Sequence, residues 1–107
     1  MQQMTAQQVA DWLADPSREQ PVLLDVREPG EYQICHIPGS RLMPMQTVPA
    51  QQTELDPDAP IVCLCHHGMR SMAVAAFLEK NGFTQVTNMS GGIDAWARQV
   101  DPGMPKY

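Results

Sequence analysis

The sequence IVCLCHHGMRSMAVAAFL, residues 61–78, joins a strand pattern to a helix pattern in one run. It opens with Ile61–Leu64, whose length and β-branched residues are typical of a buried strand. It ends with residues 72–78, an Ala-rich apolar segment that indicates a buried helix. A loop between a strand and a helix gathers backbone N–H groups and the positive end of the helix. Cys65, in this loop, is therefore predicted to lose its proton readily and to act as a nucleophile.

The other loop residues suit the binding of an anion. Arg70 stays charged and can bind oxyanions with two hydrogen bonds, and Gly68 lets the loop curl so that its N–H groups converge. Ser71 is a candidate for a helix cap, a catalytic hydroxyl or both, and the cap is the preferred interpretation. His66 and His67 are either solvated loop residues or a source of positive charge beside the thiolate. The residues alone do not assign either histidine as a general base.

Composition excludes several classes of protein. The 107 residues suffice for one domain, and 43% hydrophobic with 18% charged residues is typical of a folded globule. A net charge of -5 with seven scattered basic residues argues against nucleic acid and anionic membranes as partners. The sequence shows neither a signal-peptide pattern nor an apolar run long enough to cross a bilayer. We expect a cytoplasmic monomer without a cofactor.

Strand patterns alternate with helix patterns along the rest of the chain. This alternation predicts an α/β domain with a parallel sheet of four or five strands. The predicted helices are one that begins with a capping box at Thr5 and Gln8, a weak one in residues 46–54, and a closing one at residues 93–97. The other predicted strands are residues 22–24, 41–43 and 86–89; Asn81 and Gly82 stop the central helix. A single domain, residues 1–107, is expected to have a core at about residues 5–99 and a flexible tail at 100–107.

The three cysteines are predicted to be reduced thiols, because Cys63 and Cys65 are poorly oriented for a bridge on one strand. Cys63 is interpreted as a small buried hydrophobic residue. For Cys35, a structural role is preferred over that of a resolving thiol. Cys63, Cys65, His66 and His67 also form a cluster of soft metal donors. Their spacing is not that of zinc sites, and the neighbouring arginine disfavours a cation, so no metal is predicted.

CHHGMRS, residues 65–71, resembles the active-site loop of rhodanese-like sulfurtransferases, where four residues separate the cysteine from the arginine. Four further segments are similar to signatures of the same family and occur in family order. They are LDVRE (24–28), EY (31–32), HIPGS (36–40) and SGGIDAW (90–96). The resemblance covers about residues 5–97, which is nearly the whole chain.

The resemblance implies a rhodanese-like fold with a central parallel sheet of about five short strands and helices on both faces. It implies that the Cys65 thiolate takes the outer sulfur of thiosulfate or another persulfide donor, and that cyanide or a thiol then removes it. The segment from His66 to Ser71, with Met69 and Arg70, would bind the substrate. Asp25 and Arg27 would support the site, first as a structural ion pair.

Alternatives to this reading remain open on some points. Phosphatases that share the fold have five residues between cysteine and arginine, so a phosphatase or arsenate reductase ranks low here. The loop lacks a lysine or second arginine, so a low-turnover persulfide carrier served by a partner protein is the alternative function. Met69 and Met72 would offer such a partner an apolar rim, although Met72 also fits a core position. Cys35 stands where the family usually has glycine, which leaves a redox role open.

Overall fold

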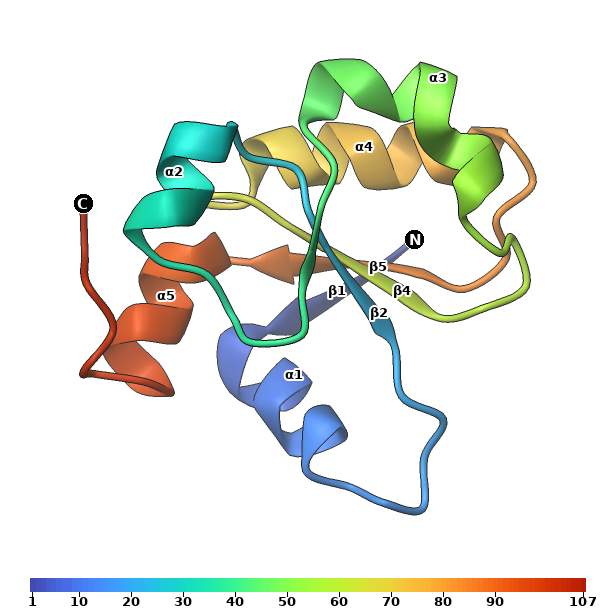
Figure 1. Cartoon of the computed structure of the whole chain (residues 1–107). Helices are drawn as coiled ribbons and strands as arrows, with labels where there is room; N and C mark the ends of the chain where they lie inside the picture. The colour runs from blue at the N-terminus through green and yellow to red at the C-terminus, as the bar shows by residue number, and fades with distance from the viewer.

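Five short parallel strands form one sheet in the order β1-β5-β4-β2-β3 in the computed structural model, which describes residues 1–107 (Figure 1). The strands are β1 (Gln2–Thr5), β2 (Val22–Asp25), β3 (Arg41–Leu42), β4 (Ile61–Leu64) and β5 (Val86–Ser90). The helices are α1 (Ala6–Leu13), α2 (Pro29–Ile34), α3 (Val48–Gln51), α4 (Met69–Lys80) and α5 (Gly92–Gln99). The predicted α/β fold with a parallel sheet of about five strands is confirmed.

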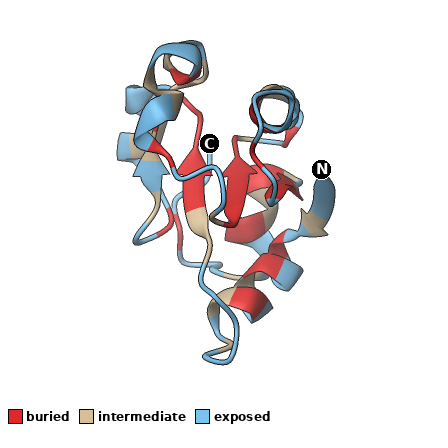
Figure 2. Ribbon diagram, turned by 90° about the vertical axis from the view of Figure 1, so that its right-hand side faces the viewer, coloured by how far each residue is buried: buried red, intermediate tan, exposed pale blue.

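Helices cover both faces of the sheet because the central strands are apolar on both sides. In β4, Val62 and Leu64 face α1 and α5, whereas Ile61 and Cys63 face α4. Figure 2 shows the central strands as mostly buried, with exposed residues on the outer helices, and β4 is buried along its whole length. The core on the α1 and α5 side comprises Ala6, Val9, Trp12, Leu23, Cys35, Ile37, Val62, Leu64, Met89, Ile93, Trp96, Ala97 and Met104.

The predicted boundaries of two helices are confirmed. Thr5 Oγ1 accepts a hydrogen bond from the Gln8 N–H at 3.1 Å, and Gln8 Oε1 accepts one from the Thr5 N–H at 2.8 Å. This capping box satisfies two backbone donors at the start of α1. At its other end, α4 stops before Asn81, and Gly82 follows with a φ of +93°.

Strand β1 has no counterpart among the predicted strands. Gln2–Thr5 is polar and mostly exposed, and it pairs with β5 at the edge of the sheet. An edge strand with so little buried surface carries no apolar pattern for the sequence to reveal. The strand nonetheless places Gln3 opposite Asn88, which bears on the site described below.

The segment before β4 is more helical than the predicted weak helix and loop. Two 3₁₀ turns, Met45–Thr47 and Gln52–Glu54, flank α3 without a break. Val48 and Leu55 are its buried anchors, and both pack into the core beneath α4. Two anchors in a polar segment give only a weak helical period, which explains the partial prediction.

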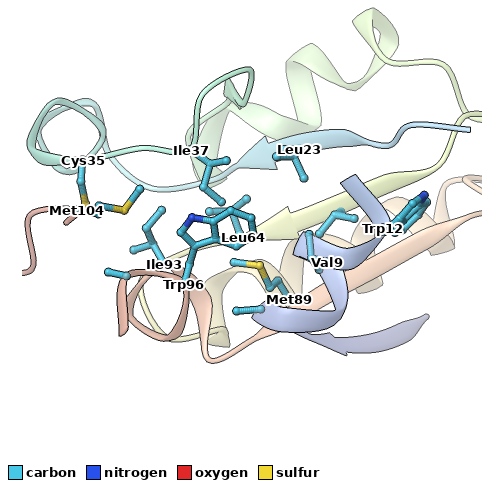
Figure 3. Close-up of a cluster of buried hydrophobic side chains, with 13 residues drawn as sticks. Val9, Trp12, Leu23, Cys35, Ile37, Leu64, Met89, Ile93, Trp96 and Met104 are labelled. Atoms are coloured by element: carbon cyan, nitrogen blue, oxygen red, sulfur yellow. The ribbon is translucent and has the colours of Figure 1, made fainter. Parts of the chain in front are cut away.

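The C-terminal segment is packed, although the sequence predicts a flexible tail at residues 100–107. Met104 is buried beside Cys35, at one end of the core (Figure 3). The Tyr107 hydroxyl accepts a hydrogen bond from Arg27 at 2.9 Å and donates one to Glu31 at 2.8 Å. A single apolar residue among prolines and glycine has no periodicity, so no sequence pattern indicates this contact.

None of the helices combines the length and the hydrophobicity that a membrane span would need.

We expect Met104→Ala to lower the free energy of unfolding by about 2 kcal/mol, because it removes a buried side chain from a packed core. Urea denaturation followed by circular dichroism measures this change. Gln99→Ala, at an exposed position of α5, is the matched control and should stay within about 0.5 kcal/mol of the wild type. An equally small effect of Met104→Ala would show that the tail is detached in solution.

Candidate active site

Cys65 directly follows β4, and its sulfur lies against the first turn of α4. The backbone N–H groups of Gly68 and Ser71 point at Sγ, with donor–sulfur distances of 3.1 and 3.4 Å. The Ser71 hydroxyl oxygen lies 3.3 Å from the same sulfur. Cys65 is only 1% exposed, so these donors act on it with little competition from water. The loop is a cradle for a negatively charged sulfur.

The surroundings of Cys65 favour its thiolate. Burial by itself would raise the pKa of Cys65, but hydrogen bonds from Ser71, Gly68 and Arg70 outweigh it, and the net pKa is lowered. Cys63 behaves in the opposite way, because burial and then the charge of Cys65 raise its pKa to about 12. Of the two neighbouring thiols, Cys65 is therefore the one that loses its proton more readily.

Gly68 gives the loop its shape. Its φ of +109° lies in the left-handed region, and a Cβ there would come within 3.3 Å of the Gly91 nitrogen. Gly68 occupies the N-cap position of α4, and Ser71 lies inside the first turn with its side chain buried. The prediction of Ser71 as the helix cap is therefore wrong: its hydroxyl turns inward, toward Cys65 and Asn88.

The N-terminus of α5 holds the loop from outside. The N–H of Ile93 donates to the Cys65 carbonyl at 2.8 Å, and the N–H of Asp94 donates to the His66 carbonyl at 3.1 Å. Gly92 makes this approach possible, since a Cβ at Gly92 would lie 2.4 Å from both carbonyl oxygens. The sequence marks this segment only through its family signature, SGGIDAW.

Arg70 is already paired with a carboxylate. Its guanidinium donates two hydrogen bonds to Glu31, at 2.7 and 2.9 Å, and Tyr107 donates a third to the same carboxylate. The hydrogen bonds from Arg70 are the main reason that the pKa of Glu31 falls to about 2. Sequence analysis predicted Arg70 as an oxyanion ligand but missed Glu31, whose only signal was its place in the Glu-Tyr signature.

Asp25 and Arg27 form an ion pair in which both side chains are fully buried, with a nitrogen–oxygen distance of 2.7 Å. Arg27 also donates to the Cys35 carbonyl at 2.8 Å and to the Tyr107 hydroxyl at 2.9 Å. The pair therefore ties β2 to the end of α2 and to the C-terminal segment. It reaches Arg70 only through Tyr107 and Glu31, which fits a supporting position.

The two histidines lie on the outside of the loop. His66 is stacked between His67 and Tyr107, with ring centroids 4.1 and 4.0 Å apart. Burial, followed by the charge of His67, lowers the pKa of His66, which disfavours a positive charge on it at neutral pH. His67 is exposed, 3.9 Å from Asp94. A charge-tuning role for these rings remains a prediction.

The structure does not assemble the Cys-His metal cluster considered from the sequence, because Cys63 points into the core. His66, His67 and Asp94 do bring side-chain nitrogen and oxygen atoms within 4.8 Å of one another, but the neighbouring Arg98 disfavours a cation there. Asp94 is engaged there by Arg98 through an ion pair of 3.1 Å.

The remaining predicted residues divide between rim and core. Met69 and Met72 are 73% and 37% exposed, so both offer apolar surface beside the loop. Cys35 is buried in the core on the α1 and α5 side, whereas Cys65 belongs to the core under α4. The two cysteines thus belong to different core clusters, and a resolving role for Cys35 stays a prediction.

Asn88 of β5 is a further polar residue that sequence analysis did not single out. It is buried, and its amide oxygen accepts the Ser71 hydroxyl at 2.6 Å. Its only signal was a polar side chain, next to Thr87, in the strand pattern at residues 86–89.

Known proteins of one family are similar to this chain. A family model described as rhodanese-like domain matches residues 5–99. The thiosulfate sulfurtransferase GlpE of Pseudoalteromonas translucida is 38% identical over 88 residues, which are 82% of this chain and 84% of that protein. A rhodanese-like domain protein from Staphylococcus aureus has a crystal structure that superposes with a TM-score of 0.82 at 29% identity, covering 90% of this chain and 91% of that one.

Longer proteins also contain a matching region. The rhodanese-like/PpiC domain-containing protein 12 of Arabidopsis thaliana, a chloroplastic protein, is 40% identical over 89 residues. These residues are 79% of this chain but only 30% of the plant protein, so the chain spans less than a third of that relative.

The Glu31 contacts predict a pH-dependent stability. The pKa of the Glu31 carboxyl is about 2 in the folded protein and about 4.3 in the unfolded chain. The carboxylate therefore stabilises the fold fully above about pH 4.3, and this stabilisation is lost as the pH falls to about 2. We expect Glu31→Gln to be about 2 kcal/mol less stable than the wild type at pH 7, and the difference to narrow between about pH 4.3 and 2. Urea denaturation at a series of pH values measures both.

Glu19→Gln is the matched control, because Glu19 is exposed and its side chain forms no ion pair. A difference between wild type and Glu31→Gln that stays constant down to pH 2 would contradict the predicted linkage.

Proposed function

The chain belongs to the rhodanese-like family, and from this premise we propose that it is a sulfurtransferase that carries sulfane sulfur as a persulfide on Cys65. One observation carries the proposal: the buried Cys65 sulfur lies within hydrogen-bonding reach of two loop N–H groups and a hydroxyl. These donors suit the anionic Cys65 sulfur that attacks in the first half-reaction and is released again in the second. A cytoplasmic location and a monomeric state stay predictions.

In the first half-reaction, the Cys65 thiolate attacks the outer sulfur of thiosulfate. A bond forms between Sγ and that sulfur, while the bond between the two sulfurs of thiosulfate breaks. Sulfite leaves with the electron pair of the broken bond, and the negative charge of the enzyme moves to the outer sulfur of the new persulfide. No external oxidant or reductant takes part.

In the second half-reaction, an acceptor attacks the outer sulfur of the persulfide. Cyanide becomes thiocyanate, or a thiolate becomes a new persulfide, and the electron pair of the sulfur–sulfur bond returns to Cys65. The N–H groups of Gly68 and Ser71, which already face Sγ, stabilise the returning charge.

Arg70 raises a second candidate function. Its charge is balanced by Glu31, and the chain as a whole carries a net charge of -5, so a thiosulfate dianion meets little attraction at the loop. A donor that delivers sulfur from a protein or thiol persulfide needs no such attraction. The alternative is therefore a low-turnover sulfur carrier that uses the same Cys65, with Met69 and Met72 on the docking rim.

Intact-mass spectrometry tests the persulfide. After incubation with thiosulfate and removal of the excess, the wild type should gain the mass of one sulfur atom, and Cys65→Ser should gain none. Cys63→Ala and Cys35→Ala are the matched controls and should still be loaded, because neither thiol lies in the loop. If thiosulfate leaves no adduct, the protein should be loaded with glutathione persulfide instead. Absence of an adduct from both donors would refute the proposal.

Steady-state assays separate the enzyme from the carrier. We expect thiocyanate formation from thiosulfate and cyanide to fall at least about 1,000-fold in Cys65→Ser, since the nucleophile is lost. Wild-type protein that loads fully from a thiol persulfide yet turns over thiosulfate no faster than Cys65→Ser would establish the carrier instead.

A further inference from the structure

The side-chain amide of Asn88 has a fixed orientation. Its nitrogen donates to the Gly68 carbonyl at 3.3 Å and to the Gln3 side-chain oxygen at 3.0 Å. Because the Gly68 carbonyl can only accept, the nitrogen must face it, and the amide oxygen is left facing Ser71. That oxygen lies 2.6 Å from the Ser71 hydroxyl, so the hydroxyl must donate to it.

Ser71 has one hydroxyl proton and three acceptors within reach. They are the Asn88 amide oxygen at 2.6 Å, the Gly68 carbonyl at 3.3 Å and the Cys65 sulfur at 3.3 Å. One proton serves one good hydrogen bond at a time, and Asn88 is by far the nearest. While Asn88 holds this proton, Ser71 presents a lone pair to the sulfur.

We propose that Asn88 is a positioning residue that competes with the Cys65 thiolate for the single hydroxyl proton of Ser71. In the thiol form, the Cys65 S–H donates to Ser71, and Ser71 donates to Asn88. When Cys65 loses its proton to solvent, the hydroxyl rotates and donates to the charged sulfur, which leaves the Asn88 oxygen without this donor. No covalent bond changes in this rotation.

The competition matters for sulfur transfer, and in this respect the inference rests on the proposed function. In the persulfide, the negative charge sits on the outer sulfur and Sγ is neutral, so the Ser71 hydroxyl can return to Asn88. The Asn88 contact is thus kept in the loaded enzyme and given up in the free thiolate. Asn88 thereby offsets part of the thiolate stabilisation and favours the loaded form over the empty one.

The other titratable and charged groups around Cys65 do not account for a change in its pKa when Asn88 or Ser71 is replaced. Arg70 at the start of α4 is the nearby cation, and it is paired with Glu31 of α2. On β4, the pKa of Cys63 is raised to about 12, so this thiol stays protonated near neutral pH. From α5, backbone N–H groups reach the loop, and Asp94 faces the histidines on its outer side. All of these stay in place when Asn88 or Ser71 is replaced.

The test is the pH midpoint of thiolate formation at Cys65, measured by ultraviolet absorbance with Cys65→Ser as the baseline. Asn88→Leu should lower the midpoint by about one pH unit, because the hydroxyl then donates to the thiolate unopposed. Ser71→Ala should raise it by a similar amount. In the Ser71→Ala background, Asn88→Leu should have no effect. The Gly68 carbonyl keeps a donor in every variant, the N–H of Met72 at 3.1 Å.

A purely structural role for Asn88 predicts the opposite sign, since a loosened loop would lose donors and raise the midpoint in Asn88→Leu. That result, or an equal shift with and without Ser71, would overturn the proposal. Circular dichroism establishes folding, and Asn88→Ala replaces the leucine variant if that one does not fold.

The wild type provides a measurement that needs no Asn88 variant. Its Asn88 side-chain amide resonances should shift at the Cys65 midpoint, and this shift should vanish in Ser71→Ala. Asn88 side-chain amide resonances that do not shift as Cys65 titrates would overturn the proposal. No sulfur donor is used in either experiment. A protein that shows these shifts but never takes up sulfur would therefore refute the proposed function and leave the proton competition intact.

Discussion

Two hydrogen bonds between the N-terminus of α5 and the loop after β4 control the geometry of the site. They hold the carbonyl oxygens of Cys65 and His66 on the outside of the loop. The carbonyl and N–H of a trans peptide point in opposite directions, so these two bonds fix the orientation of the peptides that lead into the donors Gly68 and Ser71. Only Gly92 lets the helix approach this closely. The last helix of the fold thus shapes a loop about 25 residues earlier in the chain. It does so through the free N–H groups of its first turn, which commonly bind polar groups.

The charges around the loop balance one another. Arg70 pairs with Glu31, Arg27 pairs with Asp25, and the Tyr107 hydroxyl links the two pairs. Four opposite charges in two pairs contribute no net charge to the loop. The preference for an anionic sulfur therefore comes chiefly from N–H groups and a hydroxyl held in place before any substrate arrives. Side chains that are already paired fix the shape of the site without attracting every anion in solution.

Local patterns explain what could be predicted from the sequence. The strand, loop and helix around Cys65 are continuous in the chain, and the capping box at Thr5 spans only four residues, so both can be predicted from the sequence alone. Contacts between residues far apart in the sequence cannot be predicted in this way. Glu31 and Arg70 are separated by 39 residues, and Ser71 and Asn88 by 17. β1 and the C-terminal segment were missed because a polar edge strand and a lone buried methionine lack a period. The residue type of Ser71 suits a helix cap, but its place inside the first turn depends on where the helix begins, which the residue type does not reveal.

The depth of the Cys65 sulfur has a consequence for the regiochemistry of the proposed persulfide. A nucleophile that reaches the inner sulfur would form a mixed disulfide and expel hydrogen sulfide, whereas attack on the outer sulfur transfers it. Sγ is nearly inaccessible and has donors on the side of the loop, so an in-line approach to it is blocked. The outer sulfur of the persulfide lies one bond further from the loop than Sγ does. It is therefore the atom that an acceptor reaches first. In the proposed reaction, burial of Cys65 would thus favour transfer of the outer sulfur over a dead-end disulfide.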